Sequence, residues 1–467
     1  MEITIKNVGL IANSTIKLDG LTVITGSNNS GKSTVGKIVY SCIEGLENLE
    51  EKRNLELAYY YNSIIREVQR IIKIENILGY LDMDSMTEEE RYVIEDIFGK
   101  EKRYYVHVKN IFDIQKEVED LIHGLEIFTV AFFEEHTKKS SNQFPKKYYA
   151  YLENFNASKE KALKVIGKIE AYFEDSNMLQ YAAKSLLQTF SVEFNGQIFP
   201  LKLNQKEKFS HIEISQNGEI GSEFTICNNE EIIHYDKILN KQFYKRAIFI
   251  DNPRILDSMK RSHYWSRLEF PEDHTSKLSV LLTMPEKDSI VEQTINEKAY
   301  ANIIAKIEEN VPGQLIYKDN NYYYADGPRK PLRVENLATG SKLFAIVATL
   351  LRRGCIGLDT VLIFDEPESH LHPEWQNIFA EIIVMLVREL DVNVLLTTHS
   401  TNMMLAIETY MRKYKLKDKT NFYITEPTEK NMIRYKLVND DINLIYADFV
   451  KYFTAMKIER AKYLDEE

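Results

Sequence analysis

The octapeptide at residues 26–33, Gly-Ser-Asn-Asn-Ser-Gly-Lys-Ser, constrains the fold of this chain more than any other stretch. It matches the pattern G-x-x-x-x-G-K-[ST], in which a glycine-rich loop turns its backbone N–H groups toward a phosphate. The apolar run 21–25 before it predicts a buried strand, and residues 35–43 after it predict a helix. Because strand, loop and helix in this order are the setting that such a loop requires, we expect an α/β fold around it.

The loop predicts a site for ATP and Mg²⁺. The N-terminus of the following helix adds favourable positive potential for phosphate. The Lys32 ammonium can reach the outer phosphates, and the Ser33 hydroxyl can ligate Mg²⁺. The residues expected to bind the nucleotide here are Gly26, Asn28, Asn29, Ser30, Gly31, Lys32, Ser33 and Thr34.

Composition limits the class of protein. A chain of 467 residues exceeds one ordinary domain, so we expect two or three lobes. The net charge of −11 disfavours a protein that coats nucleic acid through its overall field, although a local basic patch stays open. The three cysteines are far apart and have no ligand spacing, which argues against structural zinc. Since no apolar run approaches the roughly 20 residues of a membrane span, we expect a cytoplasmic protein without a membrane partner.

Residues 361–366, Val-Leu-Ile-Phe-Asp-Glu, predict a buried strand that delivers two carboxylates at its end. We expect Asp365 to hold the Mg²⁺ water shell and Glu366 to polarise the attacking water, because phosphoryl transfer depends mainly on positioning and charge stabilisation. Apolar strands often end in acids without such a role. Paired with the phosphate loop, the motif favours a catalytic site.

Two further segments carry candidate contacts to the nucleotide. His399 ends the apolar strand 391–398 and is placed to contact the γ-phosphate, the alternative being an ordinary surface or core histidine. Residues 335–342 precede an apolar helix, and Thr339, Gly340 and Ser341 at its start could form an anion site or a plain N-cap.

The predicted organisation is a discontinuous head with large helical insertions. The head comprises residues 1–44, 188–254 and 311–440 and begins with a β-rich subdomain. The helical insertions are 45–187, whose apolar stripe from Leu57 to Ile71 is either a short coiled arm or a core-facing helix, and 255–310. Residues 441–467 predict a C-terminal helix. Asn195-Gly196 and Asn217-Gly218 predict hairpin turns.

The order of these motifs resembles the ABC-type ATPase heads of the SMC, RecF and OLD group. Lys32 and Asp365 lie 333 positions apart (365 − 32), and heads with inserted arms tolerate such a gap. By this resemblance, 26–33 is the Walker A loop, 361–366 the Walker B strand, 368–373 the D-loop and His399 the switch histidine. The signature motif corresponds to 337–341, with Ala338 where the group usually has Ser. Asn252 falls where the group has the Q-loop glutamine, which implies a contact to the metal.

The resemblance implies an ATPase that binds ATP between two heads of a homodimer or higher homo-oligomer. Within the group, the run 365–376 is similar to stand-alone ATPases of antiphage defence, the PARIS, Septu and retron-linked kind, which govern a separate nuclease or toxin effector. Only 68 residues (467 − 399) follow His399, too few for a nuclease domain of its own. The alternative is a DNA-repair or DNA-organising ATPase of the RecF or SMC type, for which DNA would be a partner.

Overall fold

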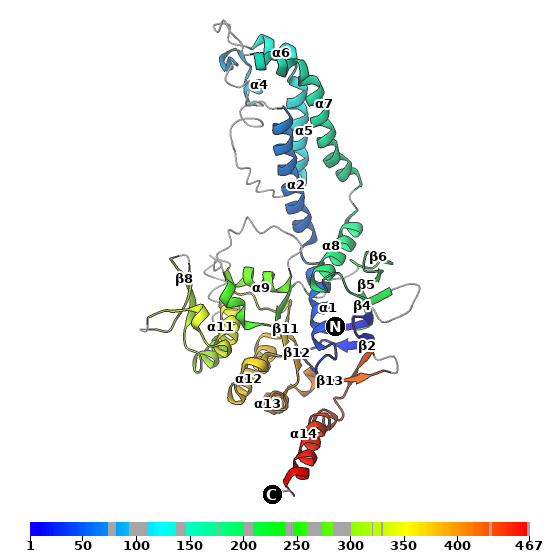
Figure 1. Cartoon of the computed structure of the whole chain (residues 1–467), viewed down its shortest axis with the longest axis vertical. Helices are drawn as coiled ribbons and strands as arrows, with labels where there is room; N and C mark the ends of the chain where they lie inside the picture. Colours follow the sequence, from blue (N-terminus) through cyan, green and yellow to red (C-terminus); the bar gives the residue numbers. More distant parts are fainter. Residues whose placement is uncertain are drawn as a thin grey trace. The chain divides into compact units, whose positions relative to one another are not determined.

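The computed structural model of the chain divides into two compact units (Figure 1). Met1–Glu47 and Ala182–Glu467 form the first, and Asn48–Tyr181 form the second. The structure describes residues 1–72, 81–92, 111–136, 146–175, 177–199, 209–239, 244, 246–259, 273–283, 300–319, 321–327, 330–428 and 432–464. None of the described helices combines the length and the apolar character needed to cross a membrane.

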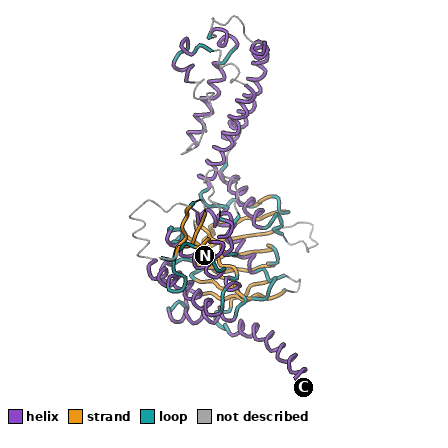
Figure 2. The backbone as a smooth tube through the Cα atoms, turned by 60° about the vertical axis from the view of Figure 1, so that its left-hand side comes forward, coloured by secondary structure: helices purple, strands orange, loops and turns teal. Residues whose placement is uncertain are grey.

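An eleven-stranded sheet is the framework of the first unit (Figure 2). Its order is β6-β5-β4-β1-β2-β14-β13-β3-β12-β11-β7, and neighbours from β13 to β7 run parallel. These parallel strands are β13 (Thr420–Pro427), β3 (Leu21–Thr25), β12 (Asn393–Thr398), β11 (Thr360–Asp365) and β7 (Arg246–Ile250). They are mostly apolar because helices cover parallel sheets on both faces.

The other end of the sheet is mainly antiparallel. It contains β1 (Glu2–Val8), β2 (Ile11–Lys17), β4 (Phe209–Gln216), β5 (Glu219–Cys227), β6 (Glu231–Ile233) and β14 (Ile433–Leu437). In β1 and β4, buried positions alternate with partly or fully exposed ones, as in a sheet with one solvated face. A separate three-stranded sheet contains β8 (Gln314–Lys318), β9 (Asn321–Ala325) and β10 (Leu332–Arg333). The α/β class with a β-rich beginning, expected from the sequence, is confirmed.

Helices pack the core of the first unit. They are α1 (Lys32–Glu44), α8 (Met178–Glu193, in this unit from Ala182 on), α9 (His274–Thr283), α11 (Thr339–Arg352), α12 (Pro373–Leu390) and α13 (Thr401–Lys413). Helix α14 (Asn443–Leu464) reaches the core near its beginning, where Ile445 is buried, and is exposed along most of its remaining described length. Helix α11 is buried without a break from Gly340 to Leu351, which its mostly apolar sequence permits. Phe379 of α12 meets Phe364 of β11 and Phe344 of α11 edge to face, with ring centroids 5.3 and 5.4 Å apart.

The second unit is helical. It contains α2 (Leu49–Ile72), η1 (Met83–Ser85), α4 (Glu88–Tyr92), α5 (Ile111–Ile127), α6 (Val130–Glu135) and α7 (Lys146–Asp175). Phe133 packs between Phe128 and Phe155, with ring centroids 5.6 and 5.1 Å away. Of the apolar stripe on α2, Leu57 is buried, whereas the side chains at positions 61, 64, 68 and 71 lie outside the described residues.

The two Asn-Gly turns have different outcomes. Asn217-Gly218 joins β4 to β5, with Gln216 opposite Glu219 and positive φ at both turn residues, so this hairpin is confirmed. The hairpin predicted at Asn195-Gly196 is wrong, because these residues lie in the turn that follows the last residue of helix α8. The Gly196 N–H donates to the Ser191 carbonyl at 2.8 Å, and both residues have positive φ. Residues that end a helix in the left-handed conformation and residues of a tight hairpin turn both have positive φ angles. The pair Asn-Gly therefore fits either setting.

The predicted second insertion, 255–310, is described only in part. Its described pieces are 255–259, which belong to η3 (Pro253–Ser258) and the residue after it, 273–283, which contain α9, and 300–310, where 300–308 are helical. The rest of that range lies outside the described residues.

Candidate functional site

The carboxyl ends of four neighbouring parallel strands meet at one edge of the sheet. The glycine-rich loop follows β3, the polar run 397–400 ends β12, the acidic pair ends β11, and Asp251 follows β7. Open α/β sheets bind their ligands at such an edge. The register therefore brings together segments that are far apart in the sequence.

The loop after β3 needs its glycines. Gly26 has φ 155°, and a Cβ there would lie 2.0 Å from Thr425 Oγ1 of β13. Gly31, at φ 75°, precedes the first residue of α1 in a left-handed conformation. The Tyr435 hydroxyl of β14 donates to the Gly31 carbonyl at 2.7 Å. Thr425 and Tyr435 thus shape the loop from more than 390 positions away, and no local signal in the sequence marks them.

The remaining loop residues present groups suited to an anion. Asn28 and Asn29 are exposed, whereas Ser30 is buried and its hydroxyl has no hydrogen-bond partner among the described residues. The Thr34 N–H donates to the Gly31 carbonyl at 3.0 Å, which closes the first turn of α1. An orphaned buried hydroxyl beside a helix N-terminus is a donor free for a phosphate oxygen.

Lys32 joins the loop to the acidic strand. Its Nζ donates to the Gly26 carbonyl at 3.0 Å and to the Ser27 carbonyl at 2.9 Å. The same atom lies 3.3 Å from Glu366 Oε1, and the side chain is almost completely buried. The fold therefore brings the loop lysine against the residue that follows the acidic strand, although the two residues are 334 positions apart (366 − 32).

The two acids at the end of β11 are held by the end of β12. The Thr397 hydroxyl donates to Asp365 Oδ1. Burial raises the pKa of Asp365, while hydrogen bonds from Thr397 and Ser33 act against this rise. Glu366 takes a left-handed conformation (φ 47°, ψ 49°), and its N–H donates to the Thr397 carbonyl at 3.1 Å. A non-glycine residue in this region is strained, and such strain is common at functional sites.

His399 faces two carboxylates. Its Nδ1 lies 3.3 Å from Glu366 Oε2 and 3.4 Å from Glu368 Oε1. The Glu368 Oε1 atom also accepts hydrogen bonds from the Thr398 hydroxyl at 2.7 Å and the His399 N–H at 2.8 Å. Burial raises the pKa of Glu368, although these hydrogen bonds act in the opposite direction. By resemblance the sequence placed Glu368 at the start of the D-loop, but it predicted no role for this side chain.

The family described as "AAA domain, putative AbiEii toxin, Type IV TA system" matches residues 21–405, from the strand before the phosphate loop to beyond His399. The chain belongs to this family. The family match confirms the predicted resemblance to ATPase heads. No curated protein matches the chain.

Similar solved structures are heads of Smc proteins. One is the Smc head bound to the C-winged helix domain of ScpA, with 10% identity, a TM-score of 0.40 and coverage of 95% of this chain and 98% of that chain. Another is the SMC head domain from Thermotoga maritima, with 9% identity, a TM-score of 0.34 and coverage of 94% and 98%. The Smc head domain with a coiled coil and joint from Pyrococcus yayanosii has 11% identity, a TM-score of 0.35 and coverage of 97% and 99%. Likeness at this level carries no inference about activity.

The residues at the start of helix α11 do not lie against the phosphate loop of their own chain. Thr339, Gly340 and Ser341 begin α11, and the described contacts include none between them and residues 26–33. Gly340 packs against its own chain: a Cβ there would lie 3.1 Å from the His370 carbonyl oxygen. Lys342 of the same turn is buried and pairs with Asp257 of η3.

Asn252 is engaged in local structure. Its side-chain oxygen accepts from the Arg254 N–H at 3.0 Å and so caps η3. The described contacts include none from Asn252 to Ser33 or Asp365, and its metal role stays a prediction. The preceding residue, Asp251, lies next to β11 at the site edge, where its charge contributes to the raised pKa of Asp365.

A buried histidine links this edge to two helices. His274, the first residue of α9, has Nε2 3.1 Å from Asp251 Oδ2 and Nδ1 2.8 Å from Glu193 Oε2 of α8. Its backbone N–H donates to Glu193 Oε1 at 2.7 Å. Burial lowers the pKa of His274, but the two carboxylates outweigh it and raise the pKa to about 9. The ring is therefore a cation at neutral pH, and no sequence motif predicted it.

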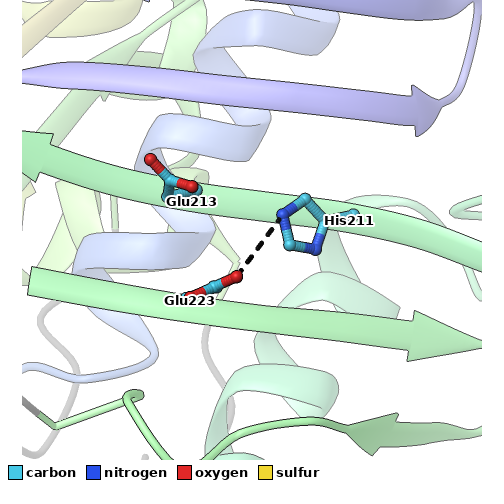
Figure 3. Close-up of side chains that lie close together, drawn as sticks. All are labelled: His211, Glu213 and Glu223. Carbon is cyan, nitrogen blue, oxygen red and sulfur yellow. Dashed lines mark ion pairs between the residues drawn. The ribbon is translucent and has the colours of Figure 1, made fainter. Parts of the chain in front are cut away.

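A second group of possible metal ligands lies on β4 and β5, not at this edge (Figure 3). Ligand atoms of His211, Glu213 and Glu223 lie within 4.8 Å of one another. However, the Lys237 Nζ donates to Glu223 Oε2 at 2.8 Å. Since a lysine already neutralises Glu223, we assign no metal to this group.

Proposed function

We propose that this chain is a Mg²⁺-dependent ATPase that binds ATP at residues 26–34 and hydrolyses it beside Glu366. The observation that carries the proposal is the 3.3 Å contact between Lys32 Nζ and Glu366 Oε1. A phosphate-binding lysine and a carboxylate able to orient water meet there, at the edge where parallel sheets bind ligands.

The residues present fit a magnesium ion. Mg²⁺ prefers hard oxygen ligands and usually takes one or two from the protein. The Ser33 hydroxyl forms a hydrogen bond with the Asp365 carboxylate, so the two oxygens are close enough for one ion to bind both. When bound, the ion would neutralise charge on the phosphate oxygens. Asp365 is kept in place by Thr397.

Side chains and backbone groups of the chain itself bind the phosphates and orient the water. Lys32 and the loop N–H groups bind the phosphates, and the buried Ser30 hydroxyl adds a donor. Glu366 accepts a proton from the water that it orients. His399, whose Nδ1 faces Glu366 Oε2, contacts the terminal phosphate through its other ring nitrogen.

Two substitutions test the hydrolysis. Lys32→Ala should abolish ATP turnover, because it removes the cation that the loop aims at the phosphates. Glu366→Gln should bind ATP and hydrolyse it at least ~10²-fold more slowly. The control is Lys37→Ala, a lysine on the same helix that bonds to the Glu193 carbonyl. Phosphate release is the measurement, and turnover of the Glu366 variant within a few-fold of wild type would point to a different catalytic carboxylate.

We further propose that the active unit is a dimer of heads. Thr339, Gly340 and Ser341 make none of the described contacts to their own loop, which supports a contact to the nucleotide of a second copy. Sedimentation of Glu366→Gln with ATP should show a dimer that Lys32→Ala does not form. A monomer that hydrolyses ATP at full rate at nanomolar concentration would contradict this proposal.

The biological role we propose is control of a separate effector, a nuclease or toxin, in antiphage defence. The family description names a putative toxin of a Type IV TA system, which supports a part in a toxin system, whereas the separate effector is our own proposal. The net charge of −11 weighs against the alternative, a clamp on DNA. Co-expression with the product of a neighbouring gene should give a complex, and the chain alone should cleave no DNA or RNA. DNA cleavage that is lost in Lys32→Ala, or strong DNA stimulation of turnover without any partner, would contradict the role.

A further inference from the structure

We infer that Glu368 is a positioning residue that acts through His399, holding the ring so that one nitrogen is committed to the protein and the other serves the substrate. The inference rests on the proposed ATP hydrolysis. It concerns a carboxylate that lies outside the acidic pair and does not contact Lys32 in the described structure.

The first argument is the set of contacts around Glu368. A single oxygen, Oε1, meets the Thr398 hydroxyl, the His399 N–H and, at 3.4 Å, the His399 ring. Three successive residues at the end of β12 thus hold the acids at the end of β11. Thr397 bonds to Asp365, Thr398 bonds to Glu368, and His399 contacts both Glu366 and Glu368.

The second argument is the cost of burying this carboxylate. Glu368 is only 4% exposed, and its second oxygen, Oε2, has no hydrogen-bond partner within the described part of the chain. Buried carboxylates are normally paired with a permanent cation. Glu381 of α12 is paired in this way, with Lys413 at 2.6 Å and Lys306 at 3.3 Å. Among the described ion pairs, Glu368 contacts no lysine or arginine, only His399.

Because carboxylates are hydrogen-bond acceptors, they determine which ring nitrogen of His399 is left for the substrate. Because Nδ1 faces two acceptor oxygens, Glu366 Oε2 and Glu368 Oε1, we place an N–H of the ring at Nδ1. Nε2 is then the nitrogen left for the substrate. Glu366 can turn toward water during the reaction, whereas Glu368 is fixed by two further hydrogen bonds and maintains the orientation.

A double-mutant cycle separates this role from a structural one. Glu368→Gln keeps the shape and the acceptor oxygen but removes the charge that faces the ring. It should lower kcat about 10- to 100-fold, as loss of a carboxylate that orients a histidine does in metal sites, while ATP affinity stays within about 3-fold. In the His399→Ala background the same change should add less than about 2-fold, because its target is gone.

The matched control is Glu381→Gln, which changes a carboxylate equally buried in the same unit. It should lower the unfolding temperature and leave kcat unchanged. If Glu368→Gln does not fold, Thr398→Val replaces it: this variant removes one hydrogen bond to Oε1 and should lower kcat severalfold.

The outcomes are distinct. A Glu368→Gln enzyme as fast as wild type, or one whose loss is equally large without His399, would overturn the inference and leave the proposed ATPase intact. His399→Ala with normal kcat would overturn it as well. A wild-type chain that binds ATP and hydrolyses none would refute the proposed hydrolysis and this inference together. Loss confined to kcat and dependent on His399 supports it.

Discussion

Replacement of His274 by glutamine should destabilise the first unit in a pH-dependent manner. His274 is buried between Glu193 of α8 and Asp251 at the end of β7, with nitrogen–oxygen distances of 2.8 and 3.1 Å. Its ring also stacks on Phe249, with centroids 4.4 Å apart. Removing the imidazolium would leave the Glu193 and Asp251 carboxylates without the cation that neutralises them.

The magnitude follows from the pKa of the ring. The folded protein raises it from the ordinary 6.5 to about 9, and each unit corresponds to about 1.4 kcal/mol, so the charged ring contributes roughly 3 kcal/mol. Because the folded pKa lies above the unfolded one, the contribution is complete below pH 6.5 and is lost as the pH rises through about 9.

The assay is denaturant unfolding of wild type and His274→Gln at several pH values from 6.5 to 9.5. The difference in free energy of unfolding should be largest near pH 6.5 and shrink by roughly 3 kcal/mol at the alkaline end. His211→Gln is the control: burial and the nearby Lys6 lower the pKa of His211, so its effect should not change over this range. A difference for His274→Gln that is constant with pH would refute the reasoning.

Three further predictions concern the glycine loop and the proposed magnesium site. Thr397→Val removes the hydroxyl that donates to Asp365, so the Mg²⁺ concentration for half-maximal turnover should rise about 10-fold in a metal titration. Gly26→Ala should abolish binding of a fluorescent ATP analogue, because its Cβ would lie 2.0 Å from Thr425 Oγ1; normal affinity would mean that the loop adapts. Tyr435→Phe removes the hydrogen bond to the Gly31 carbonyl and should weaken the same binding by about 1 kcal/mol, roughly 5-fold, an effect that an unchanged affinity would exclude.

The sequence predicted those parts of the site that a short window determines. Strand β3, the glycine loop and helix α1 follow from one apolar run and one motif, and β11 and β12 follow from apolar runs that end in polar residues. Glu368, His274 and Tyr435 escaped prediction because their roles depend on pairing between distant segments. Glu368 could have been suspected only if β12 had been known to lie beside β11, which places Thr398 next to it.

The signature-like helix start illustrates a different limit. The motif predicts what Gly340 could face in a second copy but not what it packs against in its own chain. A Cβ there would lie 3.1 Å from the His370 carbonyl oxygen and 3.2 Å from Trp375. A bulky residue at this position would therefore disturb the head itself, so Thr339, which is half-buried, is the better position to probe a contact between copies.

The order of strands in the sheet has a consequence for synthesis on the ribosome. Strand β3 lies between β12 and β13, and the Gly20 N–H donates to Asn393, 373 positions later. At 5–20 residues per second, roughly 20–75 s pass before a lateral neighbour for β3 leaves the exit tunnel. Until then the nascent chain holds the complete glycine loop at the end of β3, which has no neighbouring strand to pair with. The apolar residues of β3 stay exposed and are suited to bind chaperones. Nucleotide can stabilise the newborn head only after residues near the far end of the chain have been translated.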